Sequence, residues 1–345
     1  MKFVFLAGTL GGGGAERQLY LLSEALHTAG HDISVISFSS GDYYEKRLAM
    51  TGINVITVDS KNNLKRLWVL YKLLKNKKPD FLMSFHFYIN IYATMLGRIL
   101  NVPSVGSVRS DGIQELMNNG YIASIINYHT PTFFLGNSEN GLRNLRKALG
   151  SRGKVDILNN IVEPNEKKRN INQQSDKTVL LFVGRFYPIK RPELFLQLIR
   201  MLELQAPGNF TGMMVGDGPL RGGLEEEAIK SNLPVKFMGF SENVDELMRY
   251  SDFLVSTSLR EGSPNVILEA MSVGLRCIVL NNGCYEKWIK LGLIESYTNL
   301  NEMASSLILH EHKPENMTLS IDYITKAHSK EQVISDYLNF FKSHV

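Results

Sequence analysis

Two glutamates, Glu261 and Glu269, stand eight positions apart in the stretch REGSPNVILEA. The apolar run Phe253–Thr257 precedes them and predicts a buried strand, so we expect Glu261 on a loop just beyond a strand end. The two acids can be solvated surface groups, since a carboxylate near a helix start is electrostatically favourable without any ligand. Alternatively, they can accept hydrogen bonds from paired hydroxyl groups, Glu269 from a ribose and Glu261 from a hexose.

A helix start is predicted between these glutamates. Ser263 resembles an N-cap and Pro264 a first helical residue, so the helix should begin near Asn265. The first backbone N–H groups of a helix have no partner within it. Those of Asn265 and Val266 can therefore contact an anion.

A pair of cations stands in the stretch LLFVGRFYPIKRPEL, residues 180–194. Arg185 comes at the end of a predicted strand, where open α/β sheets bind ligands, and Lys190 follows five residues later. Together the two charges can neutralise a diphosphate, with Arg185 as a bidentate fork and Lys190 as a point charge. The alternative is a solvated basic loop.

A glycine-rich turn, Gly11–Gly14, joins the first predicted strand to the first predicted helix. Such a turn lets backbone N–H groups approach phosphate oxygens, and it can also be a flexible turn without a ligand. It does not match the dinucleotide-binding pattern, because Glu16 or Arg17 stands where a third glycine is needed. The second strand also ends without an acidic residue for a ribose, in the segment 37–40. Both departures disfavour a dehydrogenase.

These motifs lie at the ends of short apolar runs that alternate with helical periods, which predicts parallel sheets built from βαβ units. The predicted strands of the first half are Phe3–Ala7, Ile33–Phe38, Val55–Val58, Phe81–Phe85, Ser104–Val108 and Phe133–Asn137. Those of the second half are Val179–Val183, Gly212–Val215, Val235–Met238, Phe253–Thr257 and Cys277–Leu280.

The fold class predicted from this alternation is α/β, with two Rossmann-like, doubly wound parallel-sheet domains and a ligand cleft between them. We expect an N-terminal domain over 1–162, a polar linker over 163–177 and a C-terminal domain over 178–326. A last helix within 327–345 is expected to pack back towards the N-terminal domain.

Composition sets limits on the function. The 345 residues include two cysteines, too few for a disulfide framework or a zinc site, and no Asp-x-Asp occurs, so we expect no metal. No apolar run reaches the ~18 residues that span a bilayer, and a cytoplasmic protein is expected. Residues 1–160 hold 18 Lys/Arg and 11 Asp/Glu, against 20 and 23 in the remainder. The two halves are therefore expected to meet different partners.

Several of these motifs also carry a resemblance. GGGGAER, GRFYPIKRPEL, VGDGPL, MGFSENVDELM and EGSPNVILEAMSVG occur in an order and spacing similar to retaining glycosyltransferases of family 4, which have the GT-B fold. The resemblance runs from residue 1 to about residue 285, and its most specific part is the Glu-x7-Glu element with the upstream Arg and Lys.

The resemblance implies a nucleoside-diphosphate sugar as donor, with a UDP-sugar favoured over a GDP-sugar and no other cofactor. It assigns Arg185 and Lys190 to the diphosphate and Glu261 to the sugar. The other implied donor contacts are Gly13 and Gly14 for the phosphates or the sugar, Asn265 and Val266 for the sugar and phosphate, Glu269 for the ribose, and Gly239 and Phe240 for the nucleobase.

In the N-terminal domain, His86 ends the strand DFLMSFH, where the family often has a histidine near the reacting sugar. A lone histidine is more often structural, but the position at a strand end makes the functional interpretation equally good, and both stay open. Glu16 and Arg109 occupy comparable positions, and we place them near the acceptor.

The family pattern is not kept beyond LNNG. The segment Cys284–Trp288 stands where relatives have a proline–glutamate pair, and Gly274-Leu275-Arg276 replaces Gly-x-Pro. Contacts from 282–288 to the donor sugar are therefore in doubt, although Glu286 can still serve.

By resemblance, the reaction is metal-independent transfer of a hexose-type sugar to a glycan or lipid-linked acceptor, with retention, in cell-surface polysaccharide or glycoconjugate synthesis. The acceptor attacks from the face of the leaving group and its proton passes to a phosphate oxygen. A sugar-nucleotide epimerase of related architecture and a non-catalytic sugar-nucleotide-binding subunit remain alternatives.

The segment KNNLKRLWVLYKLLKNKKPD, residues 61–80, holds seven Lys/Arg against one acidic residue. Its apolar residues recur at helical spacing, which a helix packed on the sheet would explain. The excess of lysine instead favours contact between 61–78 and an anionic membrane, with the protein peripheral on the inner face of the cell membrane. Nucleic acid is not expected, because no aromatic and basic binding module occurs.

Overall fold

The computed structural model describes residues 1–163, 177–309 and 314–343, and it divides into two compact units. Unit 1 comprises Met1–Ile161 together with the chain from Lys330 onwards, and unit 2 comprises Val162–Ser329. The predicted linker 163–177 lies almost entirely outside the described residues.

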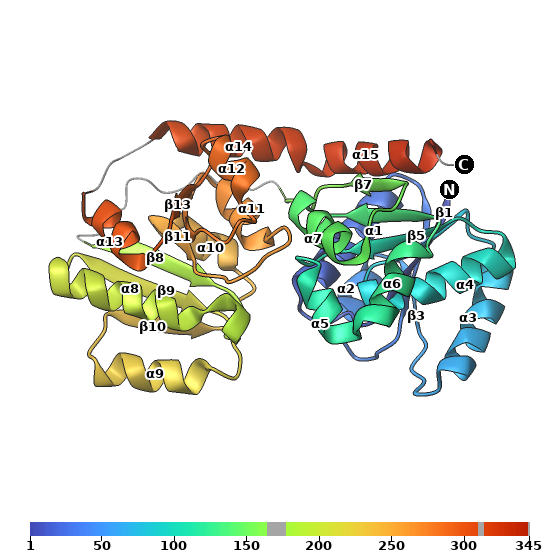
Figure 1. Ribbon diagram of the computed structural model, residues 1–345, viewed down its shortest axis with the longest axis horizontal. Coiled ribbons are helices and arrows are strands. Elements are labelled where there is room, and N and C mark those ends of the chain that lie inside the picture. The colour runs from blue at the N-terminus through green and yellow to red at the C-terminus, as the bar shows by residue number, and fades with distance from the viewer. Residues whose placement is uncertain (164–176, 310–313, 344–345) are drawn as a thin grey trace. The chain divides into compact units, whose positions relative to one another are not determined.

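Unit 1 contains a seven-stranded, wholly parallel sheet in the order β3-β2-β1-β4-β5-β6-β7 (Figure 1). Its strands are β1 (Lys2–Ala7), β2 (Asp32–Ser37), β3 (Asn54–Thr57), β4 (Phe81–Ser84), β5 (Ser104–Val108), β6 (Phe133–Gly136) and β7 (Val155–Ile157). The strand order reverses direction between β1 and β4, which is the point where doubly wound sheets bind ligands.

Helices cover both faces of this sheet. One hydrophobic cluster holds α1 (Gly14–Thr28), α2 (Tyr43–Met50) and α15 (Lys330–Lys342). Two clusters on the opposite face hold α3 (Asn63–Lys77), α4 (Asn90–Leu100), α6 (Tyr121–His129) and α7 (Glu139–Leu149). The short helices η1 (Phe87–Ile89) and α5 (Ile113–Asn119) follow the ends of β4 and β5.

Unit 2 contains a six-stranded parallel sheet in the order β10-β9-β8-β11-β12-β13. Its strands are β8 (Thr178–Val183), β9 (Phe210–Val215), β10 (Val235–Gly239), β11 (Phe253–Ser256), β12 (Arg276–Leu280) and β13 (Glu295–Tyr297). The helices are η2 (Pro188–Lys190), α8 (Pro192–Gln205), α9 (Arg221–Lys230), α10 (Val244–Arg249), α11 (Asn265–Ser272), α12 (Glu286–Lys290), α13 (Leu300–Leu309) and α14 (Pro314–Ala327).

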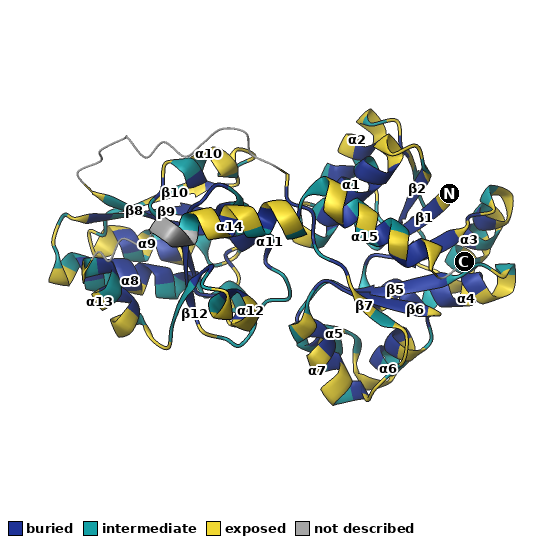
Figure 2. Ribbon diagram, turned by 90° about the horizontal axis from the view of Figure 1, so that it is seen from above, coloured by how far each residue is buried: buried dark blue, intermediate teal, exposed yellow. Residues whose placement is uncertain are grey.

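The prediction of two Rossmann-like α/β domains is confirmed. Every predicted strand is present within two residues of its expected bounds. Figure 2 shows the reason, because the inner strands are largely buried on both faces while the helices bury only one side. Two strands were not predicted, β7 and β13, since each is a three-residue edge strand with exposed or half-buried side chains and no apolar run.

The C-terminal helix α15 packs on the sheet of unit 1. The Phe341 ring lies 4.7 Å from both Phe3 and Phe81, measured between ring centroids. Lys330 at the start of the helix forms an ion pair with Glu24 of α1 at 3.0 Å.

Candidate active site

The two charged motifs of unit 2 are joined through the backbones of their loops. The amide of Leu259, after β11, donates to the carbonyl of Ile189 at 2.8 Å. The hydroxyl of Thr257 donates to the carbonyls of Lys190 and Arg191 at 3.0 and 2.8 Å. Because β8 and β11 are neighbours, the loops that leave them meet at the carboxyl edge of the sheet.

This connection brings Lys190 against Glu261. The Lys190 Nζ lies 2.5 Å from Glu261 Oε1, and the two side chains are 22% and 12% exposed. Partial burial reduces solvent screening of such a pair. The predicted cation and the predicted sugar-binding carboxylate therefore share one site in this structure.

The neighbouring Arg191 has a structural role. Its φ of 48° is in the left-handed region, and its guanidinium donates to the carbonyls of Thr257 and Ser258 at 2.6 and 3.3 Å. These bonds close the turn that positions Lys190.

Arg185 lies beyond the end of β8 with an exposed side chain. Its guanidinium stands 5.5 Å from the Tyr187 ring centroid, and it forms no ion pair with any described residue. This cation is thus open to an anionic ligand at the edge of the sheet.

Helix α11 begins at Asn265, as expected, but the residues before it have different roles from those predicted. Pro264 is the N-cap rather than the first helical residue, with a φ of −70° and a ψ of 110°, and Ser263 lies outside the helix. The amides of Ile267 and Leu268 are the ones that bond back to the Pro264 carbonyl.

The second glutamate, Glu269, is half-buried in the second turn of α11. It lies four residues after Asn265, so the two share one face of the helix. As expected from the sequence, Glu261 precedes α11 and Glu269 lies within it.

At the end of β10, Gly239 adopts a φ of 68° and its carbonyl accepts the amide of Gly216 at 2.8 Å. Phe240 follows with 65% of its side chain exposed. An exposed aromatic residue thus lies beyond the strand end, two strands away from β8.

The loop after β12 is also attached to this site. Asn282 Nδ2 donates to the Ser258 carbonyl at 2.8 Å, and the hydroxyl oxygens of Tyr285 and Ser256 lie 3.0 Å apart. Burial and the nearby carboxylate of Glu261 raise the pKa of the Cys284 thiol to about 12. The sequence left contacts between residues 282–288 and the donor sugar in doubt. The structure places this segment beside the Glu261 loop, and such contacts stay a prediction.

In unit 1, the glycine-rich turn carries a carboxylate. Gly13 is the N-cap of α1, and a Cβ added to it would lie 2.3 Å from Glu16 Oε2. Glu16 is 9% exposed and folds back over the turn. The negative charge of Glu16 at this turn opposes a phosphate, so donor contacts from Gly13 and Gly14 stay a prediction.

His86 joins this turn to the end of β4. Its Nδ1 accepts the amide of Gly8 at 3.1 Å, and its Nε2 lies 3.3 Å from Glu16 Oε1. An Nδ1 that accepts an N–H carries no proton, so in the neutral ring the proton is on Nε2 and points at Glu16. The structure brings together the predicted His86 and Glu16, with the imidazole as donor.

Two residues that sequence reasoning missed, Tyr88 and Glu115, stand near this pair. Gly8 leaves space for the phenol of Tyr88, because a Cβ there would lie 1.6 Å from its Oη. Burial raises the pKa of Tyr88, and the charges of Glu16 and Glu115 raise it further. Burial likewise raises the pKa of Glu115. A signal was present, since Glu115 is the only Asp, Glu, Lys or Arg in 113–129.

Arg109 is used differently from the expectation. Its guanidinium lies 4.3 Å from the Phe85 ring centroid and donates to Tyr337 Oη at 2.5 Å and to Asn160 Oδ1 at 3.3 Å. These contacts attach α15 to unit 1, and an acceptor contact stays a prediction.

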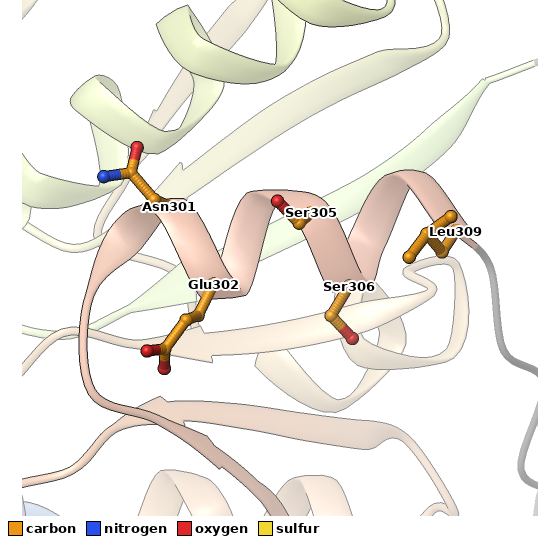
Figure 3. A pocket seen from close by; sticks show the side chains of 5 residues that line it. All are labelled: Asn301, Glu302, Ser305, Ser306 and Leu309. Carbon is orange, nitrogen blue, oxygen red and sulfur yellow. The ribbon is translucent and has the colours of Figure 1, made fainter.

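A hollow with a volume of about 460 Å³ runs along α13 (Figure 3). It is lined by Asn301, Glu302, Ser305, Ser306 and Leu309, none of which belongs to the sites above. Within 1–163, 177–309 and 314–343, no group of three or more His, Cys, Asp or Glu could hold a metal ion. No helix of the described chain is long and apolar enough to cross a membrane.

Comparison with known proteins identifies the two halves. The family model "Glycosyltransferase Family 4" matches residues 12–166, and the model "Glycosyl transferases group 1" matches residues 163–327.

Two curated relatives match most of the chain. An alpha-1,4-N-acetyl-D-galactosaminyltransferase of Campylobacter jejuni is 28% identical over 79% of this chain and 77% of its own length. An alpha-1,3-galactosyltransferase of Escherichia coli is 24% identical over 80% of each.

A solved structure, Anabaena HepE in complex with UDP, has a TM-score of 0.85 at 16% identity and covers 99% of this chain and 100% of that one. This likeness shows a shared fold, the two-domain GT-B fold. Since the two family models together span residues 12–327, the chain is a glycosyltransferase in which a family 4 domain is followed by a group 1 domain.

Proposed function

We propose that the chain transfers a hexose-type sugar from a nucleoside-diphosphate sugar to a glycan or lipid-linked acceptor, with retention and without a metal, in cell-surface polysaccharide or glycoconjugate synthesis. The observation that carries this proposal is the Lys190–Glu261 pair, beside the loop that leads into α11. The relatives support the acceptor class, because the names of the C. jejuni and E. coli enzymes include PP-undecaprenol and diphosphoundecaprenol.

In the proposed donor complex, the diphosphate interacts with Arg185, Lys190 and the first amides of α11. Lys190 then exchanges a carboxylate oxygen for a phosphate oxygen. Glu261 becomes available to the hydroxyls of the sugar, and Glu269 accepts hydrogen bonds from the ribose. The charges that hold the ground-state diphosphate also stabilise the leaving group, which gains negative charge as the sugar departs.

The proposed transfer breaks the bond between the anomeric carbon and the β-phosphate oxygen and forms a bond from that carbon to the acceptor oxygen on the same face. The acceptor proton passes to the leaving phosphate oxygen. His86 does not suit the role of base, since its Nδ1 already accepts an N–H and its Nε2 carries the proton. The imidazole instead suits a hydrogen-bond donor to a ligand oxygen.

A UDP-sugar is the proposed donor, in preference to a GDP-sugar. Solved structures of HepE contain UDP, and one contains UDP-glucose. The E. coli relative is named for UDP-Gal.

Thermal-shift measurements with UDP-, GDP-, ADP- and CDP-sugars test the donor, because ligand binding to the folded state raises the melting temperature. Nucleotide release is then measured with and without an undecaprenyl-diphosphate-linked monosaccharide. Release that depends on this acceptor is expected. Isomerised donor without acceptor would indicate an epimerase, and binding with neither product would indicate a non-catalytic subunit.

We also propose that the protein contacts an anionic membrane through residues 61–78. The basic helix α3 supports this proposal. Leu70 and Leu74 are buried against the sheet, while Leu64 and Trp68 are 78% and 56% exposed. Packing on the sheet would have explained all the apolar residues at helical spacing in α3. It explains the buried ones but not the exposed Leu64 and Trp68. On the outer side, Lys72 Nζ lies 3.7 Å from the Trp68 ring centroid.

Trp68 provides the readout, because the other tryptophan, Trp288, is 8% exposed and packed in the core. We expect the Trp68 emission to shift to shorter wavelength with vesicles of phosphatidylglycerol at low salt and not with phosphatidylcholine. Flotation with the same vesicles checks binding. A matched pair of variants, Lys65→Gln with Lys72→Gln on α3 and Lys230→Gln with Lys236→Gln on unit 2, separates a local effect from net charge. Equal binding by both pairs would argue against α3 as the contact.

A further inference from the structure

One guanidinium at the edge of the unit 2 sheet has no role in the transfer described above. Arg221 is the first residue of α9 and lies against the end of β10. A Cβ added to Gly239 would lie 3.2 Å from Arg221 Nη1 and 3.8 Å from Nη2, so the guanidinium covers this glycine. Phe240, the next residue, is 65% exposed. A cation and an aromatic ring therefore stand at the same strand end.

Two carboxylates hold this guanidinium in place. Nε donates to Glu225 at 2.8 Å and Nη1 to Asp217 at 3.3 Å, four residues to either side along the chain. Nη2 donates to none of the residues that the structure describes, and the side chain is 33% exposed. A planar group with five N–H donors, fixed at two of them, presents its remaining donors in a set direction.

Stabilising α9 does not account for this arrangement. Exposed ion pairs between residues four apart contribute little to stability. The position of the guanidinium also depends on Gly239, whose φ of 68° favours glycine and whose missing side chain leaves the space that Arg221 occupies.

The hydrogen-bonding chemistry of Arg221 can distinguish one nucleobase from another. A guanidinium donates hydrogen bonds and accepts none. It therefore matches a base edge with a carbonyl oxygen, such as O4 of uracil, and opposes the amino group that cytosine carries at the same position. An aromatic face stacks on any base and does not distinguish between them.

Resting on the proposed nucleoside-diphosphate donor, we propose that Arg221 is a specificity-determining residue that favours uracil, with a carbonyl oxygen at position 4, over cytosine, with an amino group there. Phe240 supplies the stacking surface common to both bases. Gly239 keeps the space in which the guanidinium lies.

Isothermal titration of the full chain with UDP and with CDP tests this directly, because the two ligands differ only at position 4 of the base and in the proton on the adjacent N3. The wild-type protein is expected to bind UDP about tenfold more tightly, the effect of one hydrogen bond to a charged group. Arg221→Gln should weaken UDP binding by about tenfold and leave CDP binding unchanged. Phe240→Leu should weaken both ligands by a similar factor.

Two further variants keep the result interpretable. Gly239→Ala retains Arg221 but places a Cβ 3.2 Å from Nη1, so the guanidinium must shift and the preference for UDP should be reduced. Arg200→Gln removes a comparable guanidinium, which pairs with Glu227 at 2.9 Å, and should keep the wild-type preference. Melting temperatures close to wild type show that each variant is folded. If Arg221→Gln is not folded, Arg221→Lys replaces it, because lysine also lacks the planar fork of donors.

An unchanged UDP/CDP ratio in the Arg221 variants, or equal binding of both ligands by the wild type, would overturn the inference and leave the proposed transfer intact. If UDP, CDP and GDP all fail to bind the wild type, the proposed donor itself is wrong, and the role of Arg221 is rejected with it.

Discussion

Lys190 Nζ lies 2.5 Å from Glu261 Oε1, although 71 residues separate them in the chain. The contact exists because β8 and β11 are adjacent and because Thr257 and Leu259 bond to the turn that contains Lys190. It places one positive and one negative group side by side, and in the proposed donor complex these groups would meet the diphosphate and the sugar hydroxyls. Without a ligand the two groups neutralise each other.

Glu261→Gln tests this exchange. The amide keeps the size of the side chain but loses the charge that pairs with Lys190 and attracts sugar hydroxyls. We expect the turnover number for acceptor-dependent nucleotide release to fall about a hundredfold, with the dissociation constant for UDP within about threefold of wild type. Glu302→Gln on α13 serves as control. Unchanged turnover would remove Glu261 from the mechanism.

Gly8→Ala tests the connection between Gly8, His86 and Tyr88. The added Cβ would meet Tyr88 Oη at 1.6 Å, so the phenol must move away. We expect a loss of activity of tenfold or more with UDP binding retained, because UDP is assigned to unit 2. The double variant Gly8→Ala with Tyr88→Ala removes the collision and should recover activity if the collision is the cause. If it is no more active, the glycine matters for another reason.

The half-buried carboxyl of Glu115 predicts a dependence of stability on pH. Burial raises its pKa in the folded state, so ionisation costs folding free energy as the pH rises through that pKa. Glu115→Gln removes this cost. The variant should melt about 1–3 °C above wild type at pH 7, and the difference should disappear below the unfolded pKa of about 4.3.

Scanning calorimetry from pH 4 to pH 8 measures this difference directly. Glu139→Gln, an exposed acid in the same unit, is the control and should show no such trend. A melting difference for Glu115→Gln that is constant across the range would contradict the assignment.

Arg109 is predicted to stabilise unit 1 by holding α15. Arg109→Met should lower the free energy of unfolding by about 1–3 kcal/mol, because buried polar partners lose a charged donor. Tyr337→Phe removes only the hydroxyl that Arg109 contacts and should cost less. Urea denaturation of the two single variants and the double variant gives their coupling energy. Strict additivity would show that the 2.5 Å hydrogen bond contributes nothing.

Much of the fold followed from the sequence because its signals are local. Apolar runs such as Phe81–Phe85 and Ser104–Val108 are buried on both sheet faces, so they stand out from the amphipathic helices between them. The edge strand β7 escaped detection because Asp156 and Ile157 are exposed and leave no apolar run. Candidate residues could be named because the parallel strands of each sheet end at one edge, where ligands are expected, and His86, Arg185 and Glu261 each follow such a strand end.

Side-chain partnerships were decided only by the tertiary structure. The direction of the His86 proton depends on an amide 78 residues away, and Arg109 was attached to α15 by a tyrosine 228 residues away. Trp68 was left exposed because α3 meets the sheet through Leu70 and Leu74, a rotation that helical spacing alone does not specify. The sequence by itself thus determined which elements form and which residues stand at their ends. The order of strands and the bonds between loops decided which of those residues meet, because such contacts join segments with no local relation in the chain.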